Sequence, residues 1–156
     1  MSFGFILLTC MNIAFAQGSS GQSSDQKAWL QSKDPGLAKN KKFVYDFWRD
    51  VLEAGHLELA DQFLTVTYIQ HNPNVPSGRQ AFVDFFSKFS KPQPITDSIK
   101  SPLIAIVAEG DLVILVFKRE LPDPADPAKN YATTGFDMFR IEGGKIAEHW
   151  DADTKR

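Results

Sequence analysis

The chain has 156 residues and a formal net charge of −2, from 17 lysines and arginines against 19 aspartates and glutamates. No strong basic run or face is present, so nucleic acid is not an expected partner. The single cysteine is Cys10, near the start, which leaves the rest of the chain without a disulfide or a thiol nucleophile.

The first sixteen residues carry no charged side chain and end in Ala14-Phe15-Ala16. A small-residue ending after a short apolar run is typical of a cleaved secretory signal, whereas a membrane-spanning helix needs about 20 apolar residues. We therefore expect a signal peptide over residues 1–16, a secreted or periplasmic protein, and no stable membrane span after cleavage. An uncleaved anchor and a misassigned start codon are the alternatives.

The residues after the expected cleavage site are rich in glycine, serine and glutamine and offer little to bury. They predict a flexible tether over residues 17–38. A single domain is then expected over residues 39–151, with a short tail over residues 152–156.

Helices are predicted in the first half of the domain. Apolar residues recur at helical spacing from Asn40 to Ala54, and Gly55 follows as a stop. A second, short helix is predicted over residues 57–64, and an extended segment over residues 65–71 comes after it.

Ser77 and Gln80 have the spacing of a capping box and predict the start of a third helix, which contains residues 81–89. The pattern then changes to runs rich in β-branched and aromatic residues, which predict strands over residues 99–107, 112–118, 131–141 and 145–151. Helices that precede strands favour an α+β fold, with three helices on one face of a twisted antiparallel sheet.

The last two predicted strands form a hairpin around Glu142-Gly143-Gly144. Strand alternation places Asp137 on one face with Phe139, and it places His149 and Asp151 together on one face of the returning strand. Carboxylates and an imidazole then converge on one surface, so the hairpin is a candidate site. Under the same alternation Trp150 takes the opposite face, unless a bulge changes the order.

Each candidate residue has a functional and a purely structural interpretation. His71 ends an extended segment before Asn72-Pro73, where it either serves as a general acid or base or bonds a loop carbonyl. Asp137 is either a pocket carboxylate or a surface one. His149 and Asp151 either act together or lie at an exposed chain end. The histidines and carboxylates could hold a metal, but they lack a compact ligand motif, so no metal is expected.

Four segments carry a family resemblance: Tyr68-Ile-Gln-His71-Asn-Pro, Gly78-Arg-Gln-Ala-Phe, Asp137-Met-Phe-Arg140 and Gly144-Lys-Ile-Ala-Glu-His-Trp-Asp151. Together they resemble the SnoaL-like polyketide cyclase group of the nuclear-transport-factor-2-like superfamily. The resemblance implies a cone of three helices around a strongly curved, mostly antiparallel sheet that encloses an apolar pocket. It also implies a homodimer formed through sheet faces.

In cyclases of this group an acidic pocket residue is the acid and base of an intramolecular aldol condensation, without metal or organic cofactor. Asp137 best matches that residue, and His71 and His149 match the pocket histidines. Asp151 stands where epoxide hydrolases of the superfamily have an aspartate on the final strand. The resemblance further implies a pocket wall that includes the aromatic residues Tyr68, Trp48, Phe139 and Trp150.

Two functions follow as hypotheses. The first is a cofactor-independent cyclase, isomerase or lyase that uses Asp137 as acid and base on a small, largely apolar carbonyl compound. The alternative is a secreted, non-catalytic module of the same fold that binds a small ligand. A closed cavity that contains both Asp137 and His71, with the aspartate buried, would favour the enzyme.

Overall fold

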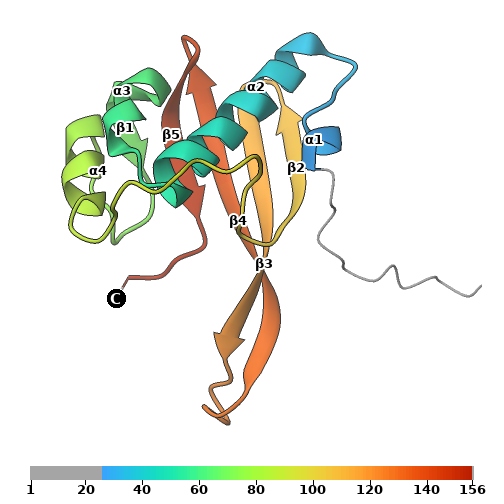
Figure 1. The fold of residues 1–156 in the computed structure, drawn as a ribbon, viewed down its shortest axis with the longest axis vertical. Coiled ribbons are helices and arrows are strands. Elements are labelled where there is room, and N and C mark those ends of the chain that lie inside the picture. The colour runs from blue at the N-terminus through green and yellow to red at the C-terminus, as the bar shows by residue number, and fades with distance from the viewer. Residues whose placement is uncertain (1–25, 156) are drawn as a thin grey trace, which may run out of the picture.

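The computed structural model describes residues 26–155, so the predicted signal and the first part of the predicted tether lie outside the described residues. Within them, five strands form one sheet, and the helices lie over one of its faces (Figure 1). We call the face beneath the helices the inner face and the other one the outer face. No helix of residues 26–155 has the length and apolar character needed to cross a membrane.

The strands lie in the order β1-β5-β4-β3-β2. Strand β1 pairs in parallel with β5, and the other neighbours are antiparallel. This arrangement confirms the predicted α+β fold with a mostly antiparallel sheet. The strand bounds are Leu64–Gln70 for β1, Leu103–Glu109 for β2, Leu112–Pro122 for β3, Asn130–Glu142 for β4 and Lys145–Asp151 for β5.

The helical elements come mostly before the sheet, as predicted. They are α1 (Gln26–Trp29), α2 (Pro35–Asp46), the π-helix η1 (Phe47–Glu53), the 3-10 helix η2 (Leu57–Leu59), α3 (Ala60–Phe63) and α4 (Arg79–Phe86). The π-helix continues α2 directly and crosses the inner face of the sheet (Figure 1). At its end the backbone N–H of Ala54 donates to the carbonyl of Arg49, five residues earlier.

The prediction of a tether over residues 17–38 is wrong from residue 26 onwards. Gln26 is buried, and its side-chain amide donates to the carbonyl of Ile99 at 2.9 Å and accepts from the Tyr45 hydroxyl at 2.6 Å. Helix α2 begins before the predicted Asn40 because Asp34 caps it, accepting from the backbone N–H of Gly36 at 2.7 Å. The domain therefore includes these residues.

The predicted capping box of the third helix is also wrong. Gly78 precedes α4 and makes no side-chain cap. The Ser77 hydroxyl instead accepts from the backbone N–H of Gln70 at 3.0 Å, which ties the loop to the end of β1.

The turn between β4 and β5 is formed by Gly143 and Gly144, which have φ angles of 58° and 79°. Positive φ at both central residues is the geometry of a tight hairpin turn, and glycine adopts it without strain. From this turn Glu142 pairs with Lys145 and Ile141 with Ile146. A β-bulge between Arg140 and Ile141 then shifts the register by one residue, so that Phe139 lies opposite His149 and Asp137 opposite Asp151. The predicted hairpin is confirmed.

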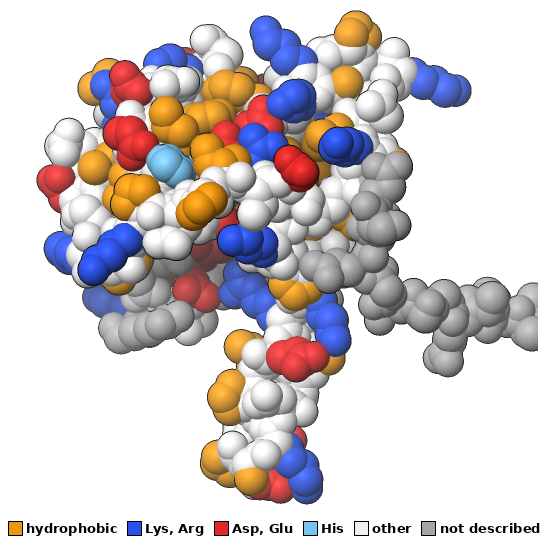
Figure 2. Space-filling model, in the orientation of Figure 1, with side chains coloured by type: hydrophobic (Ala, Val, Ile, Leu, Met, Phe, Trp, Pro, Cys, Tyr) orange, Lys and Arg blue, Asp and Glu red, His pale blue; other side chains and the backbone are white. Residues whose placement is uncertain are grey.

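Strands β3 and β4 run on together beyond the rest of the sheet. Strand β2 pairs with β3 only as far as Phe117, whereas β3 and β4 stay paired to Pro122 and Asn130. Residues 118–134 therefore project from the body as an arm (Figure 1). Basic side chains gather where the arm joins the body, with acidic side chains beside them (Figure 2).

Candidate functional site

A cavity of about 340 Å³ lies between the inner face of the sheet and the helices. Its apolar wall comes mainly from the helices and consists of Phe47, Trp48, Leu52, Val75, Phe82, Phe86 and Phe139. Its polar wall comes from the sheet and the segment that follows β1, and consists of Tyr68, Gln70, Asn72, Asp137, His149 and Asp151. Glu53 and Ser101 complete the lining. A few convergent polar groups in an apolar cavity are typical of a small-molecule site.

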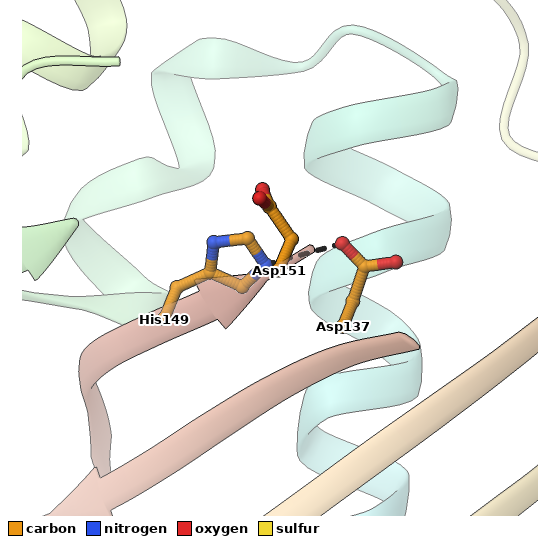
Figure 3. Close-up of side chains that lie close together, drawn as sticks. All are labelled: Asp137, His149 and Asp151. Carbon is orange, nitrogen blue, oxygen red and sulfur yellow. Dashed lines mark hydrogen bonds and ion pairs between the residues drawn. The ribbon is translucent and has the colours of Figure 1, made fainter. Parts of the chain in front are cut away.

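The hairpin delivers three of these groups. Asp137 on β4 and His149 and Asp151 on β5 all point from the sheet towards the helix layer (Figure 3). One ligand atom from each lies within 4.8 Å of the others. Asp137 and Phe139 share the inner face, as do His149 and Asp151, because side chains two residues apart on a strand point the same way.

Asp137 and His149 form a buried hydrogen bond. The Nε2 of His149 lies 3.2 Å from Oδ1 of Asp137, and the two residues are 7% and 4% exposed. The second oxygen of Asp137, Oδ2, is also buried and makes no hydrogen bond within residues 26–155. One oxygen of this carboxyl group is therefore left for a ligand.

Strand β1 holds the other side of the histidine. Gln70 Oε1 accepts from the backbone N–H of Asn72 at 3.1 Å and lies 2.8 Å from Nδ1 of His149. The backbone N–H can only donate, so it fixes which end of the Gln70 amide is oxygen, and this oxygen requires a proton on Nδ1.

The hydrogen bonds of Gln70 determine how many protons Asp137 and His149 carry between them. With Nδ1 protonated, the hydrogen bond between His149 Nε2 and Asp137 Oδ1 needs one further proton, carried either by the imidazole or by the carboxyl group. The hydrogen bond between the two side chains thus contains one proton, in addition to the proton on Nδ1. Such a pair can take up a proton and return it.

Tyr68 places a phenol beside this pair. Its hydroxyl accepts from Gln70 Nε2 at 3.2 Å, and it donates no hydrogen bond within the described part of the chain. Burial, and then the charges of Asp151 and Asp137, raise the pKa of the Tyr68 phenol well above its ordinary value. The phenol therefore keeps its proton and can donate it to a ligand oxygen.

Asp151 is held in place by two donors. Its Oδ2 accepts from the side-chain amide of Asn72 at 2.7 Å, and its Oδ1 accepts from the backbone N–H of Asp153 at 2.9 Å. Asp151 therefore lines the cavity with both oxygens already engaged.

The structure does not bring His71 and Trp150 to the cavity, so their predicted place in the pocket is wrong. Both lie on the outer face, where their rings stack with centroids 4.4 Å apart and planes 5° apart. His71 Nε2 lies 2.8 Å from Oε2 of Glu148. Side chains an odd number of residues apart on a strand point to opposite faces of the sheet. His71 is three residues from Tyr68, and Trp150 is one residue from His149, so both side chains lie on the outer face.

The remaining aromatic residues of the predicted pocket do line the cavity. These are Tyr68, Trp48 and Phe139. Trp48 also stacks on Phe117 of β3, with ring centroids 4.5 Å apart.

Gln70 and Asn72 are site residues that the sequence analysis missed. They follow Tyr68 at spacings of two and four, so the same alternation that excludes His71 selects them. They do not titrate, and a search for acids and bases passes over them.

Asp137, His149 and Asp151 are also the described residues that could hold a metal ion. An ion there would replace the hydrogen bond between His149 and Asp137 and compete with the donors to Asp151. The expected absence of a metal stays a prediction.

Comparisons with known proteins agree with this architecture. The family described as the SnoaL-like domain matches residues 44–149. A SnoaL-like polyketide cyclase candidate from Jannaschia sp. CCS1 has a similar structure, with a TM-score of 0.53 and 14% identity over 78% of this chain and 91% of that one. No curated protein matches the sequence.

Two further solved structures share the fold. A polyketide cyclase candidate from Acidithiobacillus ferrooxidans has a TM-score of 0.51 and 18% identity, over 72% of this chain and 86% of that one. An NTF2-like protein of unknown function from Burkholderia pseudomallei has a TM-score of 0.51 and 10% identity, over 74% of this chain and 91% of that one. At these identities the likeness concerns the fold alone.

Proposed function

Because this chain belongs to the SnoaL-like domain family, we propose that it is a cofactor-independent enzyme that moves a proton next to the carbonyl group of a small, largely apolar compound. The reaction class is an aldol-type cyclisation, an isomerisation or a lyase reaction. The observation that carries the proposal is the buried hydrogen bond between Asp137 and His149 in a cavity with an aromatic wall.

In the first step the pair acts as the base. With the shared proton on His149, Asp137 is a carboxylate whose buried Oδ2 accepts no hydrogen bond within residues 26–155, and the guanidinium of Arg119 lies 3.7 Å from it. The C–H bond next to the substrate carbonyl breaks, its electron pair enters the enolate, and the proton goes to Asp137 Oδ2. General base catalysis by a positioned group contributes about 10² to 10⁴ in rate.

The negative charge that develops on the carbonyl oxygen needs a donor. Tyr68 supplies it, because its hydroxyl lines the cavity and its raised pKa keeps it protonated. His71, one of the two predicted pocket histidines, faces away from the cavity.

The second step returns the proton from Asp137. Protonation of the same or another carbon gives exchange or isomerisation. If the enolate carbon attacks a second carbonyl of the same molecule, a C–C bond forms and the new alkoxide takes the proton. Each course restores the starting state of the pair.

Proton exchange tests this function directly. The α-hydrogens of 2-tetralone are followed by NMR in deuterated buffer, with and without the protein. Asp137→Asn keeps the volume and removes the titrating group, so the catalysed rate falls by about 10²-fold or more. The matched control, Glu148→Gln on the outer face, stays within about twofold of the unaltered protein.

Added chelator is expected to leave the rate unchanged. Equal exchange by the unaltered protein and Asp137→Asn would remove Asp137 as the base. The site would then serve as a small-ligand-binding module.

The outer face supports a proposal about assembly. It exposes apolar side chains from three strands, with Ile69 43%, Val107 52% and Phe136 50% exposed. A shallow, mostly apolar depression lies among them, and its lining consists of Ile114, Phe136, Met138, Trp150, Asp151 and Ala152. A second copy of the chain would cover this surface in a homodimer. Export of the protein remains a separate proposal that rests on residues 1–16.

A further inference from the structure

Arg119 lies at the root of the arm, beside the cavity. Its Nη2 is 3.7 Å from Oδ2 of Asp137, and its Nη1 is 3.9 Å from Oδ1 of Asp153. Both distances are longer than hydrogen bonds, which have donor–acceptor distances of about 2.7–3.2 Å. The guanidinium therefore balances the negative charges of Asp137 and Asp153, while its N–H donors stay available to a ligand. The Arg119 side chain is 41% exposed.

Gly135 allows the arginine to lie there. A Cβ atom at this position would be 2.1 Å from Nε of Arg119. Gly135 pairs with Phe117 inside the β3–β4 ladder, and it is not among the glycines with positive φ. Since glycine weakens a strand interior, its presence in a regular strand points to a close approach, and here the approaching group is Arg119.

A second cavity adjoins the first at this point. Its volume is about 250 Å³, it shares Trp48 and Ser101 with the first cavity, and Pro102, Phe117, Lys118 and Arg119 complete its lining. None of the described residues that line it is acidic, whereas Glu53, Asp137 and Asp151 line the first cavity. The combined site thus has an acidic end and a basic end.

We propose that the substrate of the proposed function carries a carboxylate and that Arg119 binds it. The planar guanidinium matches a carboxylate through two parallel N–H donors. A ligand carboxylate that replaces Asp153 at Nη1 reaches this fork from the exposed side. The acidic residues of the first cavity repel the same group, so the carbonyl carbon is directed to Asp137 and the acid group to Arg119. The substrate class is accordingly an oxo acid with an apolar body.

A matched pair of probes tests the inference by binding alone. Isothermal titration calorimetry compares 4-oxo-4-phenylbutanoate with its amide, which has nearly the same shape and no charge. The unaltered protein is expected to bind the acid about 10-fold more tightly than the amide. Arg119→Gln removes this preference and leaves the affinity for the amide within about twofold.

Two more variants separate the role of Arg119 from general charge and from folding. Lys118→Gln removes the neighbouring cation, whose Nζ already pairs with Glu120 at 2.9 Å, and is expected to keep the preference. Gly135→Ala keeps the arginine and displaces its side chain, so the preference falls although the net charge is unchanged. Circular dichroism checks that each variant is folded.

The inference is overturned if the unaltered protein binds the acid and the amide with equal affinity. Weak binding of both compounds counts as this outcome. An acid preference that survives Arg119→Gln also overturns the inference. If α-hydrogens exchange but the protein does not bind the acid more tightly than the amide, this inference is wrong and the proposed function stands. An acid preference without exchange at the α-carbon of either 2-tetralone or 4-oxo-4-phenylbutanoate would support Arg119 as the binding group and overturn the enzyme.

Discussion

On the inner face of the sheet, Asp137 and His149 share a hydrogen bond of 3.2 Å inside a cavity. On the outer face, Glu148 and His71 share one of 2.8 Å in contact with solvent. The two pairs come from neighbouring positions of β5 and contain the same kinds of side chain. The difference lies in what surrounds them.

Glu148 has both oxygens engaged, one by His71 and one by Arg140 at 2.6 Å. The hydrogen bond from His71, and then the one from Arg140, hold the pKa of the Glu148 carboxyl below its ordinary value. Asp137 keeps one buried oxygen without a hydrogen bond in residues 26–155. A carboxylate next to an imidazole is thus a structural ion pair on one face and a candidate base on the other.

The sharpest way to break this comparison is to remove each histidine in turn. His149→Ala deletes the group that holds the shared proton, and exchange of 2-tetralone α-hydrogens is expected to fall by about 10²-fold. His71→Ala, on the outer face, is expected to stay within about twofold. A larger loss for His71→Ala than for His149→Ala would reverse the assignment of the two faces.

Tyr68→Phe removes one donor from the inner face without changing the ring. The same exchange rate is expected to fall by about 10-fold to 10²-fold, because a single donor to a developing oxyanion contributes a few kcal/mol. Tyr131→Phe, at an exposed position of the arm, is the control. An unchanged rate in Tyr68→Phe would mean that another group stabilises the enolate.

The outer face has its own test. Phe136→Asp places a charge in the exposed apolar surface, and light scattering is expected to show the mass of one chain where the unaltered protein shows two. Phe89→Asp, which changes an exposed phenylalanine just after α4, should leave the dimer intact. If light scattering shows that the unaltered protein is monomeric at micromolar concentration, the proposed homodimer is wrong.

The smallest effect is expected from the outer ion pair. Because the folded-state pKa of Glu148 is lowered, its contribution to stability is present above the unfolded value of about 4.3 and is lost as pH falls through the folded value. Glu148→Gln should therefore lower the urea midpoint slightly at pH 7 and leave it unchanged at about pH 2 to 3. The same decrease at both pH values would show that packing, and not charge, is lost.

Alternation explains most of what the sequence predicted correctly. Within each strand, a period of two places Asp137 with Phe139 and His149 with Asp151. The β-bulge next to Arg140 is what brings both pairs to one face, because a regular ladder would place Asp137 opposite Trp150. His71 has the chemistry of a site residue but the wrong parity, since Tyr68 and His71 cannot share a face of a regular strand. Alternation favours Gln70 and Asn72 instead.

Two other features, the contact of Arg119 and the place of Gln26, could not be predicted from a local sequence pattern, whereas the start of α2 could. The contact of Arg119 with Gly135 depends on the pairing register of β3 and β4, which brings together residues far apart in the chain. The early start of α2 was available in Asp34-Pro35, a capping residue followed by a proline, but the apolar period begins only later. Gln26 joins the domain through contacts with Tyr45 and Ile99 that no local pattern predicts.

The π-helix η1 and the sheet supply different parts of the cavity. It contributes Phe47, Trp48 and Leu52 to the cavity, while the sheet and the segment after β1 contribute the polar groups. A π-helical turn differs from an α-helical one by a single residue, and one-residue insertions or deletions convert one into the other. Such a change would reshape the apolar wall and leave the proton-carrying pair where it is. A one-residue change in η1 would therefore alter which ligands fit the cavity without moving Asp137 or His149.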